Sequence, residues 1–136
     1  MSQQPTAFLN ARLIDPASRY DGPGAVLVRD GRIVDVIQGA APQGLSNDIE
    51  SIDCGDAVLS PGLIDLRVKT GEPGSETKET LASAARAAAA GGVTIFVVQP
   101  DTDPVIDDPS VADFILRRAR DIDSVRIFPA GAGTKG

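Results

Sequence analysis

Three charged residues, Asp65, Arg67 and Lys69, lie at alternate positions in segment 60–74, which reads SPGLIDLRVKTGEPG. Side chains alternate between the two faces of a β-strand, so these three are expected on one face of a buried strand. One interpretation is a solvated face with a local ion pair. The other is a functional site at the mouth of a barrel, where the carboxyl ends of strands carry the chemistry.

The chain contains no histidine. Its own residues therefore cannot build a Ser-His-Asp or Cys-His nucleophile, or a histidine-based zinc site. Carboxylates remain as possible ligands, and these suit magnesium or calcium. The Asp-rich segment 101–108 lacks the spacing of an EF-hand loop, so we interpret it as a loop with helix-capping acids.

A glycine pattern occurs at the end of the sequence, where Gly131 and Gly136 bound the segment GAGTKG. It matches G-x-G-x-x-G after a predicted strand, which makes a nucleotide-binding fragment one alternative. A dinucleotide site also needs a helix that opens at the glycines and an acid about 20 residues further on. The printed sequence supplies neither. Lys135 is followed by glycine, so the P-loop pattern is not met either.

The composition limits the classes of partner. The 136 residues are 42% hydrophobic and 24% charged, which fits one soluble globular domain or a domain with a small appendage. A net charge of −6 argues against nucleic acid and anionic membranes as partners. The sequence shows neither a membrane-spanning run nor the features of a signal peptide, so we expect a cytoplasmic protein. Cys54 is the single cysteine and is interpreted as a packing residue.

Residues 1–60 are predicted to form a small antiparallel, sandwich-like β domain. Its clearest signal is a hairpin at 25–37, in which Asp30 and Gly31 supply the positive-φ pair of a two-residue turn. Further short strands are expected at 7–14, 49–53 and 57–59.

From residue 61 the hydrophobic period changes, and 61–136 is predicted to be α/β. Asp108 is expected to cap a helix that opens with Pro109. Strands are expected at 63–68, 93–98 and 125–128, and helices at 76–90 and 109–121. The order βαβαβ predicts a parallel sheet with right-handed crossovers. Three strands cannot close a barrel, so we expect this part to be completed by further chain or by a partner.

Several motifs in this order resemble the N-terminal third of the dihydroorotases, which are metal-dependent (β/α)8 barrels of the amidohydrolase superfamily. The motifs are LSPGLIDLRVK at 59–69, EPG at 72–74, KET at 78–80, AAGGVT at 89–94 and QPDTDP at 99–104. The resemblance covers nearly the whole chain. It implies a partial (β/α)8 TIM barrel, with the first three strands and two helices, preceded by a small antiparallel β domain.

The resemblance also implies an altered site. Where dihydroorotases carry the two histidine zinc ligands of a His-x-His motif, this chain has Arg67 and Lys69. A guanidinium has no lone pair to give, and an ammonium cannot ligate until it is deprotonated. The family's substrate-binding arginine and asparagine align with Gly71 and Asp101. We therefore expect no cofactor in this chain, although the family uses zinc.

The resulting expectation is a non-catalytic, dihydroorotase-like protein of de novo pyrimidine biosynthesis. Some members of this family are structural partners of aspartate carbamoyltransferase, and the chain resembles them. Arg67 and Lys69 would then place fixed positive charge where zinc would sit, against acidic groups of the remaining barrel. The alternative within the family is an active cyclic amidohydrolase that converts dihydroorotate to carbamoyl aspartate at an altered metal site.

Overall fold

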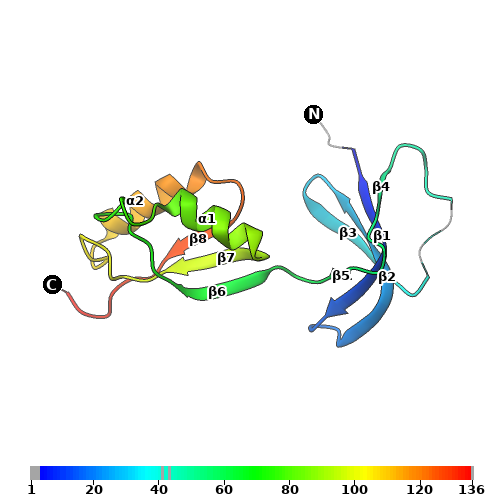
Figure 1. Ribbon diagram of the computed structural model, residues 1–136, viewed down its shortest axis with the longest axis horizontal. Helices are drawn as coiled ribbons and strands as arrows, with labels where there is room; N and C mark the ends of the chain where they lie inside the picture. The colour runs from blue at the N-terminus through cyan, green and yellow to red at the C-terminus, as the bar shows by residue number, and fades with distance from the viewer. Residues whose placement is uncertain (1–3, 41, 43, 136) are drawn as a thin grey trace. The chain divides into compact units, whose positions relative to one another are not determined.

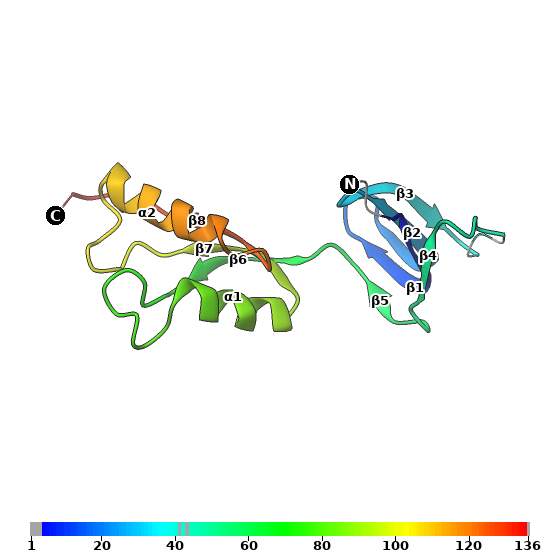
Figure 2. The same cartoon turned by 90° about the horizontal axis from the view of Figure 1, so that it is seen from above.

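The structure is a computed structural model that describes residues 4–40, 42 and 44–135. It divides into two compact units, Met1–Pro61 and Gly62–Gly136. In Figures 1 and 2 the first unit runs from blue to green and the second from green to red. No helix within the described ranges is long and apolar enough to cross a membrane.

The described strands of the first unit form one five-stranded sheet with the order β3-β2-β1-β4, and β5 also pairs with β1. The strands are β1 (Thr6–Asp15), β2 (Tyr20–Arg29), β3 (Arg32–Gln38), β4 (Glu50–Asp53) and β5 (Val58–Leu59). Between β2 and β3, Asp30 and Gly31 have φ values of 51° and 70°, which suit the twist of a tight hairpin turn.

The prediction of an antiparallel, sandwich-like unit is wrong for this sheet. β1 and β2 are antiparallel, as are β2 and β3, but β4 and β5 run parallel to β1. Parallel neighbours cannot be joined by a tight hairpin turn, and β2 and β3 lie between β1 and β4 along the chain. The alternation of side chains in a short strand carries no information about its direction.

The second unit contains a three-stranded parallel sheet with the order β6-β7-β8. Its strands are β6 (Leu63–Val68), β7 (Val93–Val98) and β8 (Arg126–Pro129), and its helices are α1 (Leu81–Ala90) and α2 (Pro109–Arg120). Both helices pack on the same face of the sheet (Figures 1 and 2). The largest fully buried side chains of the described residues all belong to this unit, and they are Leu81, Phe96, Val98, Ile106 and Ile115.

The two helices begin at defined caps. Asp108 accepts a hydrogen bond from the Ser110 backbone N–H, as its predicted capping role requires. The first helix, however, begins at Leu81 rather than at Glu76. Thr80 and Ser83 form a reciprocal capping box there. The carboxylate of Glu76 accepts from the Gly74 N–H and so belongs to the preceding turn.

The strand β6 is exposed, not buried as the sequence predicts. Leu63, Ile64 and Leu66 are 59%, 59% and 69% exposed. β6 is an edge strand of the three-stranded sheet. Ile64 pairs with Ile95, and so lies on the face opposite to Phe96, which packs in the core with residues of both helices. The apolar sequence of β6 therefore predicts buried side chains, but the described residues do not cover them.

Candidate functional site

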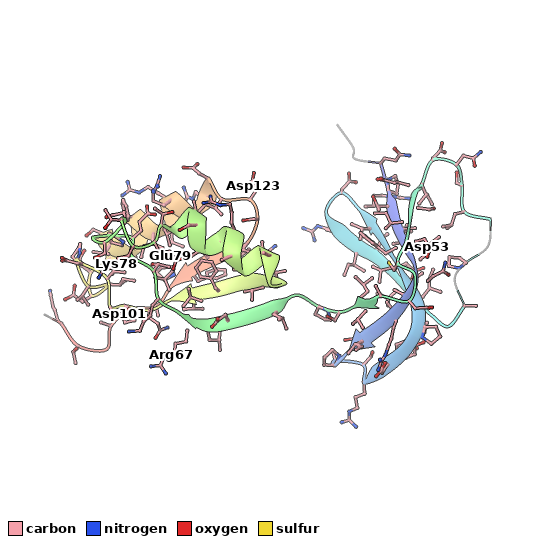
Figure 3. All side chains as sticks on the ribbon, in the orientation of Figure 1. Asp53, Arg67, Lys78, Glu79, Asp101 and Asp123 are labelled. Carbon is pink, nitrogen blue, oxygen red and sulfur yellow. The ribbon has the colours of Figure 1, made fainter. Side chains whose placement is uncertain are left out.

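The predicted site residues gather at the carboxyl ends of β6 and β7. Arg67 and Lys69 lie at the end of β6, and Asp101 follows β7. The strands are parallel, so both ends lie at the same edge of the sheet, as Figure 3 shows for Arg67 and Asp101. The Lys69 ammonium forms an ion pair with the Asp101 carboxylate across this edge. Two positions that are 32 residues apart in the sequence are thus direct partners.

A bulge in β6 determines which side chains face the helices. Asp65 pairs with Phe96 and Val68 pairs with Val98, so β6 has one residue more than β7 between these pairs. Asp65 therefore lies on the same face as Phe96, whereas Arg67 lies on the side away from the helices (Figure 3). The prediction that Asp65 shares a face with Arg67 and Lys69 is wrong, because the extra residue breaks the strict alternation.

The bulge is stabilised by hydrogen bonds from side chains. The Asp65 carboxylate accepts from the Arg67 backbone N–H at 2.9 Å. Gln99 donates from Nε2 to the Leu66 carbonyl at 3.1 Å and from its backbone N–H to the Val68 carbonyl at 2.9 Å. A bulge interrupts the regular ladder and leaves backbone groups in need of such partners. Asp65 thus supports the end of the strand.

Asp101 is neutralised by its own chain. The hydrogen bond from Lys69 lowers the pKa of the Asp101 carboxyl, and the charges of Lys69 and Arg67 add to this effect against partial desolvation. The carboxylate is therefore ionised at neutral pH, and together with Arg67 and Lys69 it leaves one net positive charge. The sequence identified Asp101 only as the residue that aligns with the family's substrate-binding asparagine, because nothing local to it identifies Lys69 as a partner.

Gly71 lies in a tightly folded part of the loop between β6 and α1. Its backbone N–H donates to the Glu79 carbonyl at 3.1 Å. A Cβ atom at Gly71 would lie 2.1 Å from the Ser75 carbonyl oxygen and 2.7 Å from that of Glu79. The loop thus leaves no space for a side chain at the position that aligns with the family's substrate-binding arginine.

Glu72 is a buried residue whose role the sequence did not reveal. It is 2% exposed. One carboxylate oxygen accepts from Arg118 Nε at 2.6 Å, and the other accepts from the Leu81 backbone N–H at 2.9 Å. This pairing raises the pKa of Arg118. Glu72 joins the loop after β6 to both helices, through a partner 46 residues away that no local pattern identifies.

The described residues do not fit the zinc that the resemblance implies. Arg67 offers no lone pair, and the Lys69 ammonium is held by Asp101. Across residues 4–40, 42 and 44–135, no group of three or more His, Cys, Asp or Glu side chains could hold a metal ion. The positions at which the resemblance implies zinc ligands carry cations instead.

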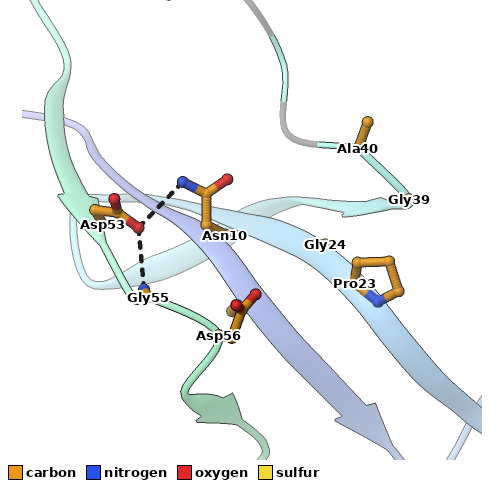
Figure 4. Close-up of a pocket in the computed structure, with 9 residues that line it drawn as sticks. Asn10, Pro23, Gly24, Gly39, Ala40, Asp53, Gly55 and Asp56 are labelled. Atoms are coloured by element: carbon orange, nitrogen blue, oxygen red, sulfur yellow. Dashed lines mark hydrogen bonds between the residues drawn. The ribbon is translucent and has the colours of Figure 1, made fainter.

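A separate pocket of about 460 Å³ lies in the first unit (Figure 4). Its lining includes Asn10, Asp53 and Asp56, and none of the four predicted site residues. Asp53 accepts from the Gly55 N–H and from Asn10 Nδ2, both at 3.0 Å, and these bonds lower its pKa. The carboxylate thus serves the turn after β4.

The glycine pattern lies in the loop after β8. Gly136 falls outside the described residues, and the described part of the loop contains no helical turn. Ala132 donates to the Ile106 carbonyl at 2.7 Å. These glycines remain a sequence pattern without the helix N-terminus that would hold a phosphate.

Comparison with known proteins supports the resemblance. The family model described as "Dihydro-orotase-like" matches residues 56–135. The dihydroorotase of Geobacter sp. (strain M21) is 42% identical over 126 residues, which are 92% of this chain and 29% of that protein. The "Dihydroorotase-like protein" of Pseudomonas aeruginosa is 45% identical over 93% of this chain and 29% of its own length. The chain thus spans less than a third of these relatives.

Solved structures share the fold at lower sequence identity. The L-hydantoinase from Arthrobacter aurescens matches with a TM-score of 0.80 and 22% identity, over 96% of this chain and 28% of that one. Molinate hydrolase matches with a TM-score of 0.68 and 24% identity, over 97% and 31%. The family model covers more than half of the residues, and on this ground the chain belongs to the dihydro-orotase-like family.

Proposed function

We propose that the protein carrying this chain is a non-catalytic dihydroorotase-like protein of de novo pyrimidine biosynthesis and a structural partner of aspartate carbamoyltransferase. The observation that carries the proposal is the cationic strand end. Arg67 and Lys69 stand where the resemblance implies zinc ligands, and Lys69 is paired with Asp101. A cytoplasmic location belongs to the same proposal.

The fold of the second unit supports a role as the first part of a (β/α)8 barrel. Its three strands are parallel, and each of the first two is followed by a helix on the same face. The relatives are more than three times as long as this chain. We infer that further strands from the same polypeptide complete the barrel.

The test uses the full-length protein and the aspartate carbamoyltransferase of the same organism. The two are purified separately and together, and dihydroorotate hydrolysis is measured with and without added zinc. We expect no hydrolysis above the uncatalysed rate in either case, and a stable complex of defined mass in light scattering. Zinc-dependent turnover would contradict the proposal, and so would two proteins that elute independently.

An active cyclic amidohydrolase is the second candidate. The names of the relatives favour it, since several that are 40–45% identical are called dihydroorotase. In that case the ligands for a metal would come from outside the described residues, because Arg67 and Lys69 cannot provide them. Turnover of dihydroorotate in the same assay, at a rate that depends on zinc, distinguishes this candidate from the first.

A further inference from the structure

The ion pair between Lys69 and Asp101 joins two strand ends that the chain reaches through separate segments. Lys69 follows β6, and Asp101 follows β7 after the whole of α1 has intervened. The same edge is also tied by the Gln99 backbone N–H, which donates to the Val68 carbonyl. Both charged residues stand at positions where the resemblance implies an uncharged site residue, a histidine and an asparagine.

We propose that Lys69 and Asp101 form a matched charge pair that fastens the end of β6 to the end of β7 without a metal ion. This proposal rests on the proposed function only where it assigns the two positions to a former metal and substrate site. Each residue supplies the charge that the other requires. The two substitutions are thus a single exchange of charge and not two independent losses.

Either charge would be unfavourable at this strand end without the other, because each of Lys69 and Asp101 provides the opposite charge for its partner. Without Asp101, the Lys69 ammonium would lose its ion-pair partner and would lie two residues from the like charge of Arg67. Without Lys69, the Asp101 carboxylate would lose the donor that holds it. With both present, Arg67, Lys69 and Asp101 together carry one net positive charge, and the two cations disfavour a divalent cation beside them.

Exposure sets the size of the expected effect. The side chains of Lys69 and Asp101 are 70% and 45% exposed among the described residues. Exposed ion pairs usually change stability little, because water screens the charges and ordering the side chains costs entropy. We therefore expect a coupling that is measurable but modest, about two- to fivefold in the unfolding equilibrium constant.

The test is a double-mutant cycle in the full-length protein. Lys69→Met, Asp101→Asn and the double variant are compared with the wild type by urea unfolding. We expect each single variant to raise the unfolding equilibrium constant and the double variant to be no less stable than either single one. Where the single variants do not fold, the charge-swapped protein with Lys69→Asp and Asp101→Lys should fold and recover most of the stability.

The control cycle combines Lys78→Met with Asp123→Asn, two exposed residues of the same unit with no ion pair between them in the described structure. Its effects should add. Additive losses in the Lys69 and Asp101 cycle would overturn the proposal, and so would stoichiometric zinc binding that stabilises the wild type. Hydrolysis of dihydroorotate would instead contradict the proposed function, while the cycle would still report on the coupling.

Discussion

The Lys69 ammonium cannot bind a metal ion, because its nitrogen carries a proton where a ligand needs a lone pair. In the structure this ammonium instead donates a hydrogen bond to the Asp101 carboxylate. Arg67 cannot lose its charge at all under ordinary conditions. At the scale of single residues, Arg67 and Lys69 therefore place fixed charge at this strand end and do not coordinate a metal ion.

The loop around Gly71 has no space for a side chain. We expect Gly71→Ala to destabilise the protein by about 1–3 kcal/mol, the usual cost of forcing an added group into a filled space. The added Cβ would lie 2.1 Å from the Ser75 carbonyl oxygen, so the loop must move. The measurement is the free energy of unfolding in urea. Gly133→Ala is the matched control, because no atom lies within 4 Å of its Cβ position.

A neutral Gly71→Ala variant would show that the loop readily adopts a second conformation. It would also reopen the position to a longer side chain, such as the arginine that the resemblance implies. Equal destabilisation by Gly133→Ala would trace the effect to the loss of glycine in general and not to the crowding by Ser75 and Glu79.

At the scale of elements, Glu72 connects the loop after β6 to both helices. Its carboxylate caps the Leu81 N–H at the start of α1 and pairs with Arg118 on α2. We expect Glu72→Gln to cost about 1–3 kcal/mol, because hydrogen bonds to a charged group are among the stronger ones and Glu72 is buried. The midpoint of urea unfolding measures the loss.

Glu79→Gln provides the comparison for Glu72, since Glu79 lies in the same loop but is only half-buried. We expect this variant to stay within about 0.5 kcal/mol of the wild type, as surface substitutions usually do. If both variants were equally stable, Glu72 would have no special part in holding the loop and helices together.

The elements differ in how far the sequence determined them. β7 and α2 were predictable, because a short apolar run and an Asp-Pro cap each act within a few residues. The start of α1 was not, because the capping box at Thr80 competes with helix-forming residues further upstream. The bulge in β6 was also hidden, since its hydrogen-bonding partner Gln99 lies more than 30 residues away.

The sequence likewise predicted some features of the candidate site and not others. Its location was predicted from Arg67 and Lys69, which the resemblance to the dihydroorotases aligns with that family's zinc ligands. Its internal pairing did not, because the contacts of Lys69 with Asp101 and of Glu72 with Arg118 depend on how strands and helices meet in space. A single sequence does not reveal which charged residues pair when they lie 32 or 46 positions apart.

At the scale of the whole molecule, the sheet of the second unit has one covered and one open face. Ile64 pairs with Ile95 on the face opposite to Phe96, and it is 59% exposed in the described structure. Apolar residues on both faces of a strand are typical of parallel sheets that are covered on both sides. Under the proposed barrel, the remaining polypeptide covers Ile64 in the full-length protein.

Ile64→Ala tests that cover in the full-length protein. If Ile64 is covered, the substitution should lower the free energy of unfolding by about 2–5 kcal/mol, because burial is lost and a cavity is left behind. If Ile64 is uncovered, the free energy of unfolding should fall by less than about 1 kcal/mol, because only the preference for β-branched residues in strands is lost. Val105→Ala, at a 41% exposed position in the loop after β7, is the control in the same unfolding experiment. A small effect at Ile64 equal to that at Val105 would mean that the open face stays open, and the barrel proposal would then fail at this strand.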